Sequence, residues 1–147
     1  MHAALSQNVD ESVDFDEVAR TIVRMAGAIA STDHAVEVIT TGTFGTISAD
    51  QAQALATVLN ELVANSVEHG LADRDGRIEV CAQRDNLSMK VTVADDGVGF
   101  VPGTPMSGLG TQIVHQMVRG ELRGSIEWAP REGGGTLVTL LINLDPA

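Results

Sequence analysis

The stretch NELVANSVEHG, residues 60–70, has the apolar content of a buried helix together with an unusual number of polar groups. Each residue of an α-helix advances by about 100° around the axis, so spacing decides which side chains share a face. The polar side chains of Glu61, Asn65, Glu68 and His69 fall within roughly one quarter of the circumference. A second arc carries Leu55, Leu59, Leu62, Val63 and Ser66. The stretch therefore predicts a helix that buries one side and presents a polar stripe beside it.

The polar stripe offers a carboxylate, an amide oxygen and an imidazole. Carboxylate and amide oxygens are ligands that Mg²⁺ and its bound waters prefer. An ordinary solvent-facing side of a helix has a similar composition, so the stripe alone leaves both interpretations open. The choice between them depends on the sequence further along the chain.

The segments around this helix alternate between helical and strand periodicity. Apolar residues at helical spacing predict an amphipathic helix over residues 13–30 and another over residues 109–122. Ser48 with Gln51 three residues later is a capping-box pattern, which predicts that the longest helix begins there and runs to about His69. Alternation and turn residues predict strands at 35–42, within 43–48, and at 77–84, 87–94, 124–130 and 135–143.

The order of these elements predicts the fold class. Pairs of strands, rather than single strands, alternate with the helices. This order is typical of an α+β protein, here a two-layer α/β sandwich whose mixed or antiparallel β-sheet carries three main helices on one face. It does not fit a doubly wound parallel sheet. A chain of 147 residues is long enough for one such domain and too short for two.

Composition limits the classes of partner. The net charge is −11, from 9 basic and 20 acidic residues, which argues against nucleic acid or an anionic membrane as the main partner. No apolar run approaches the roughly 20 residues that span a bilayer, and the first residues lack the pattern of a signal peptide. Cys81 is the only cysteine, so no intrachain disulfide can form. We therefore expect a cytoplasmic location and no membrane segment in this chain.

Three glycine-containing stretches follow the polar stripe. Asp95 comes at the predicted end of a strand and is followed by Gly97 and Gly99. Glycines let the backbone approach a flat ligand closely, and the carboxylate could accept a hydrogen bond from an exocyclic amine such as that of adenine. A tight turn has the same composition, so the alternative of a plain turn stays open.

The other two glycine stretches come directly before predicted elements. Gly108 and Gly110 flank Leu109 at the start of a helix, where exposed N–H groups form an anion site. Residues 133–135 are glycines that precede Thr136 and the last strand. Taken singly, the first is equally a helix entry and the second a hairpin turn. The G-x-x-x-x-G-K-[ST] phosphate loop is absent and G-x-G-x-x-G is incomplete, which excludes those two nucleotide-binding motifs.

In this order and spacing the four stretches together resemble the boxes of the Bergerat-fold (GHKL) ATPases, the group of gyrase, Hsp90, histidine kinases and MutL. Within the group, ELVANSVEHG and the short lid segment FVPGTPMS look most like the catalytic, ATP-binding domain of a two-component sensor histidine kinase of the soluble actinobacterial type. The resemblance covers nearly the whole chain. It implies the end of a dimerisation helix and a junction over residues 1–12, and the catalytic domain over residues 13–147.

The resemblance implies a role for each box. Asn65 would bind Mg²⁺, and Glu61, one helical turn earlier, would lie near the metal waters and the γ-phosphate of ATP. These two are the expected catalytic and metal-binding residues. Asp95 would bind the adenine amine. The other expected contacts with ATP are His69 facing the nucleotide, Gly97 and Gly99 at the pocket floor, Gly108, Leu109 and Gly110 around the phosphates, and Thr136 on the adenine side.

Two features depart from the pattern of many such kinases. Glu68 stands where they carry a lysine that contacts phosphate, and the lid, residues 100–107, is very short. A short lid covers little of a triphosphate, so we expect weak ATP binding and rapid exchange.

The function implied by the resemblance is transfer of the γ-phosphoryl group of ATP, with Mg²⁺, to a histidine on dimerisation helices outside this chain. A response regulator would be an indirect partner. Two alternatives stay open: an anti-sigma factor kinase of the same fold, which phosphorylates a serine, and a non-catalytic nucleotide-binding module. The segments GLGTQIV and GSIEW resemble the histidine kinases more and favour the first function.

Overall fold

The computed structural model describes residues 11–30, 35–71, 75–97 and 109–145. The elements in chain order are β1 (Ser12–Asp14), α2 (Phe15–Ala30), β2 (Val36–Gly42), β3 (Thr46–Ser48), α3 (Ala49–Asn65), the π-helical turn η1 (Ser66–Gly70), β4 (Gly76–Arg84), β5 (Ser88–Asp95), α4 (Leu109–Arg119), β6 (Ser125–Pro130) and β7 (Thr136–Asn143). Pairs of strands alternate with α-helices, as the sequence predicts. The short strand β1 at the start is an addition to that prediction.

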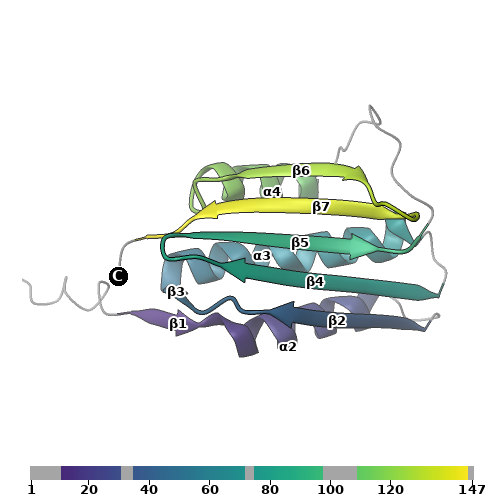
Figure 1. Cartoon of the computed structure of the whole chain (residues 1–147), viewed down its shortest axis with the longest axis horizontal. Helices are drawn as coiled ribbons and strands as arrows, with labels where there is room; N and C mark the ends of the chain where they lie inside the picture. Colours follow the sequence, from purple (N-terminus) through teal and green to yellow (C-terminus); the bar gives the residue numbers. More distant parts are fainter. Residues whose placement is uncertain (1–10, 31–34, 72–74, 98–108, 146–147) are drawn as a thin grey trace, which may run out of the picture.

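Five of these strands form one mixed sheet in the order β2-β4-β5-β7-β6. β2 and β4 are parallel, and the other neighbouring pairs are antiparallel. Side chains alternate along each strand, so that in β5 Met89, Val91 and Val93 are buried while the residues between them are half-buried or exposed. One face of the sheet is therefore covered and the other is open (Figure 1).

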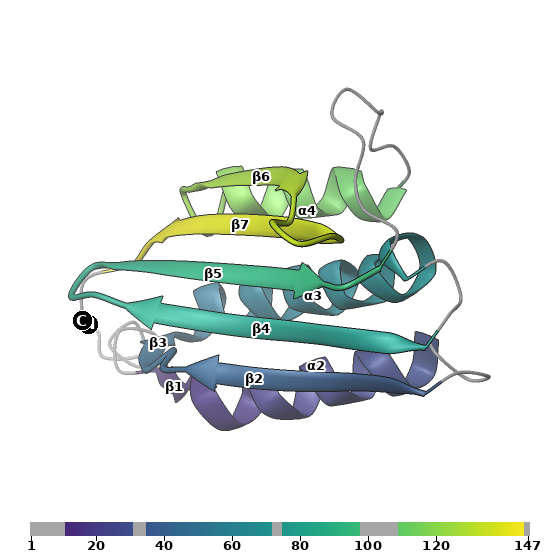
Figure 2. The same ribbon diagram turned by 45° about the vertical axis from the view of Figure 1, so that its right-hand side comes forward.

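The three α-helices pack on the covered face of the sheet. α2 lies alongside β2, α3 behind the centre of the sheet, and α4 behind β6 and β7, and the turned view keeps this arrangement (Figures 1 and 2). One core joins the two layers, in which Phe15 of α2, Leu59 of α3 and Val91 of β5 are fully buried. The predicted two-layer sandwich is thus confirmed. In the described part of the chain, no helix is both long enough and apolar enough to cross a membrane.

The first helix begins at Phe15, later than the periodicity predicts, because residues 12–14 pair with β3 as a strand. The Asp16 carboxylate accepts hydrogen bonds from the backbone N–H groups of Phe44 at 2.6 Å and Gly45 at 3.2 Å. The N–H of Phe15 donates to the carbonyl oxygen of Gly45 at 2.9 Å. Contacts with the loop between β2 and β3 therefore set the start of this helix, and helical periodicity does not contain that information.

Ser48 caps α3 as predicted: its Oγ accepts a hydrogen bond from the N–H of Gln51 at 3.2 Å. The second half of the capping box is not formed, because the fully buried Gln51 side chain bonds elsewhere. Its Nε2 donates to the carbonyl oxygens of Glu121 and Asn143, both at 2.9 Å, and its Oε1 accepts from the N–H of Asp145 at 2.8 Å. Gln51 thus joins the start of α3 to the segment before β6 and to the end of β7.

α4 packs on the edge strand β6 through a contact between two rings. The centroids of the His115 and Trp128 rings lie 5.4 Å apart, with the ring planes inclined at 51°. The helix ends at Arg119, three residues before the predicted end at 122. Arg123, with φ at 46°, then turns the chain toward β6. A half-buried His115 at this position serves packing between the layers.

Candidate functional site

The carboxylate of Asp95 lies at the end of β5 on the covered face of the sheet, where the residue is only 2% exposed. Its Oδ1 accepts hydrogen bonds from two backbone N–H groups, that of Gly97 at 3.0 Å and that of Thr136 at 3.2 Å. No other described group donates to this carboxylate, so Oδ2 has no hydrogen-bond partner within the described residues. The structure therefore brings together three of the residues that the sequence selects, with Oδ1 of Asp95 held by two hydrogen bonds and Oδ2 unpaired among the described residues.

Burial raises the pKa of the Asp95 carboxyl above its usual value, because an apolar environment disfavours the charged form. The hydrogen bonds from Gly97 and Thr136 lower the pKa, and so does the charge of Arg131. The negative charge of Asp96 raises it. The net result is a carboxylate whose charge is costly in the free protein and which gains from meeting a further hydrogen-bond donor.

The last glycine stretch packs directly on the backbone of Asp95. Gly135 has φ at 99°, and a Cβ built there would lie 1.9 Å from the Asp95 carbonyl oxygen. Gly133 and Gly134 also have positive φ, at 90° and 113°, but a Cβ on either would meet open space. Two separate features therefore require glycine at position 135: its positive φ and its close approach to the backbone of β5.

The polar stripe of α3 meets the start of α4. A Cβ built on Gly110 would lie 2.2 Å from Oε2 of Glu61 and 3.0 Å from its Cδ. Glu61 and Gly110 are both half-buried at this contact. The structure thus places the Glu61 carboxylate of the polar stripe against Gly110 at the start of α4.

Asn65 is the last residue of α3 and is half-buried, as the helical pattern predicts for a residue beside the buried arc. The next residues form the π-helical turn η1, in which the N–H of Leu71 donates to the carbonyl oxygen of Ser66 at 2.7 Å. Such wide turns are rare and occur often at functional sites. The sequence predicts a helix to about His69 but gives no sign that its last turn is wide. Glu68 in this turn is exposed.

Part of the predicted site lies outside the described residues. Gly99 and Gly108 belong to that part, and nothing is described of the side chains of His69 and Leu109. The expected roles of Asn65 at the metal and of Asp95 at the adenine therefore stay predictions. Within the described residues, no group of three or more His, Cys, Asp or Glu side chains could hold a metal ion. A metal at Asn65 and Glu61 would need further ligands from phosphate or water.

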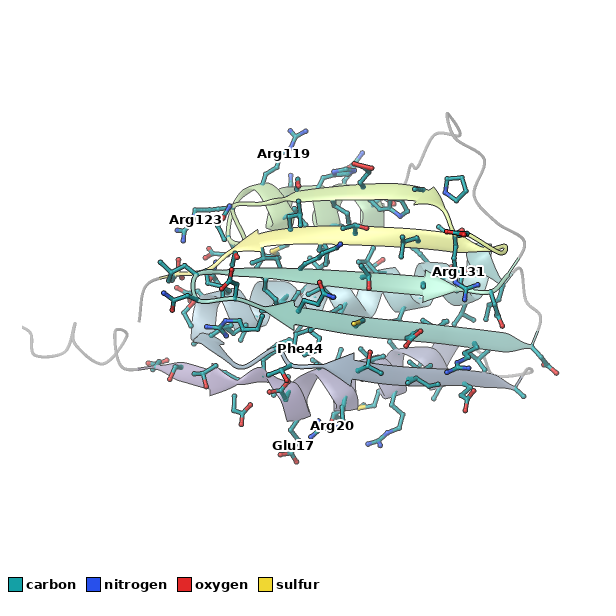
Figure 3. The ribbon with its side chains drawn as sticks, viewed as in Figure 1. Glu17, Arg20, Phe44, Arg119, Arg123 and Arg131 are labelled. Atoms are coloured by element: carbon teal, nitrogen blue, oxygen red, sulfur yellow. The ribbon has the colours of Figure 1, made fainter. Side chains whose placement is uncertain are left out.

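A separate hollow of about 190 Å³ lies on the other side of the sheet, behind Asp95. The side chains of Arg77 and Glu79 alternate with buried neighbours along β4 and so point to the open face. Arg131 also lies over the end of β5 on this face, where it donates to the carbonyl oxygen of Gly134 at 3.0 Å (Figure 3). The hollow is lined by Arg77, Glu79, Ala94, Asp95, Asp96 and Arg131.

The sequence did not predict a role for Arg131, although it directly precedes the segment that leads into the last glycine stretch. Its effect depends on the hairpin between β6 and β7, which carries it over the end of β5. The guanidinium is the only described cation that lowers the pKa of Asp95. The charge of Arg131 therefore lowers the pKa of the Asp95 carboxyl from the opposite side of the sheet.

Comparison with known proteins identifies the class to which this fold and site belong. Residues 50–146 match the histidine kinase-, DNA gyrase B- and HSP90-like ATPases, and the chain belongs to this family. It is 36% identical to the sensor histidine kinase PdtaS of Mycobacterium tuberculosis, over 97% of this chain and 29% of that protein. The PdtaS of Mycolicibacterium smegmatis is also 36% identical, over 97% of this chain and 30% of that protein. The chain thus spans less than a third of the length of these relatives.

Solved structures share the fold. The histidine kinase domain of the blue-light activated histidine kinase EL346 from Erythrobacter litoralis superposes with a TM-score of 0.78 at 24% identity, covering 90% of this chain and 62% of that chain. The mycobacterial sensor histidine kinase MprB gives a TM-score of 0.66 at 22% identity, covering 93% and 99%. The resemblance seen in the sequence is confirmed: the chain is homologous to sensor histidine kinases, and membership of this ATPase family implies that it binds ATP. The anti-sigma factor kinase and the non-catalytic module are not favoured.

Proposed function

We propose that this chain is the catalytic domain of a sensor histidine kinase that transfers the γ-phosphoryl group of Mg²⁺-bound ATP to a histidine on dimerisation helices outside the chain. The observation that carries the proposal is the buried Asp95 carboxylate, held by Gly97 and Thr136, in a chain of this ATPase family. The 36% identity to PdtaS supports histidine, rather than serine, as the acceptor. A response regulator would receive the phosphoryl group from that histidine, and the cytoplasm is the compartment that supplies ATP.

At the purine end, Oδ2 of Asp95 would accept a hydrogen bond from the exocyclic amine of adenine. Oδ1 is already bound by the N–H groups of Gly97 and Thr136, which fix the orientation of the carboxylate. Hydrogen bonds to a charged group are about twice as strong as neutral ones. The amine would therefore offset part of the cost of the buried charge, and that gain favours a purine with an amine over one with a carbonyl oxygen at the same position.

At the phosphate end, Asn65 and Glu61 stand one helical turn apart on α3 and offer an amide and a carboxylate oxygen. These hard oxygen donors fit Mg²⁺, which would neutralise charge on the phosphates when bound. Backbone N–H groups at the start of α4 would donate to phosphate oxygens. With only 9 basic residues in the chain, backbone donors and the metal would supply most of the positive field.

The reaction is a displacement at the γ-phosphorus. An imidazole nitrogen of the acceptor histidine forms the new P–N bond, the bond to the bridging oxygen breaks, and ADP leaves. The residues of this chain bind and orient ATP and form no covalent bond with it, so catalysis rests on positioning and on electrostatic stabilisation of the phosphoryl group.

Incubation with labelled ATP tests the proposal. The domain, supplied with the dimerisation helices of the same kinase, should yield a phosphorylated product whose label is lost in acid. Asn65→Ala should lose Mg²⁺-dependent binding in calorimetry and should lose transfer. The proposal fails if Asn65→Ala binds Mg²⁺-ATP as tightly as the parent. An acid-stable label would identify a serine kinase instead.

A further inference from the structure

Gly110 is a glycine whose own backbone does not require one. It lies in the first turn of α4, and its φ is not among the positive values found at other described glycines. Alanine is favoured over glycine in a helix interior by about 1 kcal/mol. The reason for glycine at this position must therefore lie in what surrounds it.

The surroundings point to a single side chain. The three heavy atoms nearest to a Cβ at Gly110 all belong to Glu61: Oε2 at 2.2 Å, Cδ at 3.0 Å and Oε1 at 3.5 Å. The obstacle is the end of a flexible side chain, and no backbone atom stands as close. An added methyl group would leave the fold intact and turn the carboxylate aside.

We propose that Gly110 is a positioning residue, and that its missing side chain sets where the Glu61 carboxylate lies. The proposal rests on the proposed function, in which Glu61 acts near the metal waters and the γ-phosphate. It adds a role to the expected one, in which the glycine lets phosphates approach the backbone. α3 and α4 would then be coupled through one steric contact, and the placement of a metal-side carboxylate would depend on the glycine stretch of another helix.

A double-mutant cycle separates the two roles. The four proteins are the parent, Gly110→Ala, Glu61→Ala and the double variant, and calorimetry measures their affinity for ATP with and without Mg²⁺. We expect Gly110→Ala to lower the Mg²⁺-dependent affinity of the parent by about threefold or more, the scale of coupling between residues in contact. In the Glu61→Ala background the same substitution should change the affinity by less than about twofold. Gly120→Ala, just after the other end of α4, is a control away from Glu61 and should leave the affinity unchanged.

A conservative variant adds a second arm to the test. Glu61→Asp keeps the charge but shortens the side chain by one methylene, which leaves room for a methyl group at position 110. Gly110→Ala should therefore cost the Glu61→Asp variant less Mg²⁺-dependent affinity than it costs the parent. Equal losses in the parent and in the Glu61→Asp and Glu61→Ala backgrounds would show that the glycine acts on phosphate directly, and would overturn the positioning role.

A third readout needs no nucleotide, so it distinguishes failure of this inference from failure of the proposed function. In urea unfolding, Gly110→Ala should raise the midpoint in the Glu61→Ala background, where only the helix preference of alanine acts. In the parent the rise should be smaller, because the carboxylate must move. Identical shifts in the two backgrounds would overturn the proposal even if no protein of the set binds ATP. If the parent does not bind ATP, that result by itself contradicts the proposed function. It leaves the positioning role of Gly110 to be decided by the unfolding measurements.

Discussion

The backbone N–H of Thr136 donates a hydrogen bond to Oδ1 of Asp95 across 41 residues of sequence, at 3.2 Å. Together with the bond from Gly97, this contact fixes a buried carboxylate at the point where β5 ends and β7 begins. The purine acceptor proposed for this chain is therefore part of the sheet framework, and its orientation does not depend on a mobile side chain.

Replacing Asp95 by Asn should separate binding from stability. The amide oxygen can still accept from Gly97 and Thr136, but the buried negative charge is lost. We expect ATP affinity to fall about tenfold or more, the scale of a charged hydrogen bond. Urea unfolding should show unchanged or increased stability, because burial already disfavours the charged form. A large loss of stability with unchanged affinity would contradict the role proposed for this residue.

The raised pKa of Asp95 gives stability and binding opposite pH dependences. A group with a raised pKa in the folded state contributes stability that is present below its unfolded value, near 3.8, and is lost as pH rises through the folded pKa. The stability gain of Asp95→Asn over the parent should therefore shrink as pH falls through that window. ATP affinity of the parent should fall over the same window, because a protonated carboxyl is a poor acceptor. Paired unfolding and calorimetric series measure both. The assignment is refuted if the stability gain of Asp95→Asn stays constant or grows as pH falls, or if the ATP affinity of the parent does not fall with it.

Arg131 should influence the pKa of Asp95 from the open face of the sheet. Its charge lowers the pKa of Asp95, so Arg131→Ala should raise that pKa further. The midpoint of the pH profile for ATP binding should move to higher pH, while the affinity well above the midpoint stays close to that of the parent. Arg119→Ala, exposed at the end of α4, is a charge-matched control that should leave the midpoint in place. An unmoved midpoint in Arg131→Ala would exclude the electrostatic contact.

Gly135→Ala should destabilise the fold more than the same change one residue earlier. Both positions have positive φ, which costs alanine about 1–3 kcal/mol. Only at Gly135 would the new methyl group also collide with the Asp95 carbonyl oxygen. Gly134→Ala is thus a matched control for backbone strain, and urea unfolding of the two variants measures the difference. Equal destabilisation would mean that Gly135 does not make the close contact with the Asp95 carbonyl oxygen described above.

Gln51→Glu should strongly destabilise the domain although it changes only one amide to a carboxyl. The substitution removes both donor bonds, to Glu121 and Asn143, and sets a buried carboxylate against their carbonyl oxygens. An unsatisfied buried group costs about 1–3 kcal/mol, and a charged one costs more, so we expect a loss of at least ~3 kcal/mol. Gln53→Glu, two residues away and exposed, should change stability by no more than about 0.5 kcal/mol. Thermal unfolding at neutral pH compares them, and similar melting temperatures would count against the buried network.

Much of the fold could be predicted from the sequence because it rests on local periodicity. The alternation along β5 and the two arcs of α3 are visible as spacing, and Leu59 and Val91 are buried as that spacing requires. What could not be predicted depends on contacts between distant segments. Gln51 follows its capping pattern only halfway, because carbonyl groups 70 and 92 residues along the chain compete for its amide.

The candidate site shows the same division. The types, order and spacing of Asp95, Asn65 and the glycines carry the family resemblance that implies a nucleotide, because each box is a short local pattern. The contact of Glu61 with Gly110 and the position of Arg131 over β5 follow from packing of separate elements, which no local pattern contains. The wide turn after Asn65 has no sequence signal that we can identify.

The tilted contact between the Trp128 and His115 rings gives the domain an intrinsic fluorescence reporter. The chain contains one tryptophan, so all indole emission comes from the seam between β6 and α4. Emission from an indole changes with its immediate surroundings, and the first turn of α4 contains Gly110, which is expected beside the phosphates. A shift of that helix on nucleotide binding can therefore be followed by intrinsic fluorescence in real time, with no dye, label or further mutation.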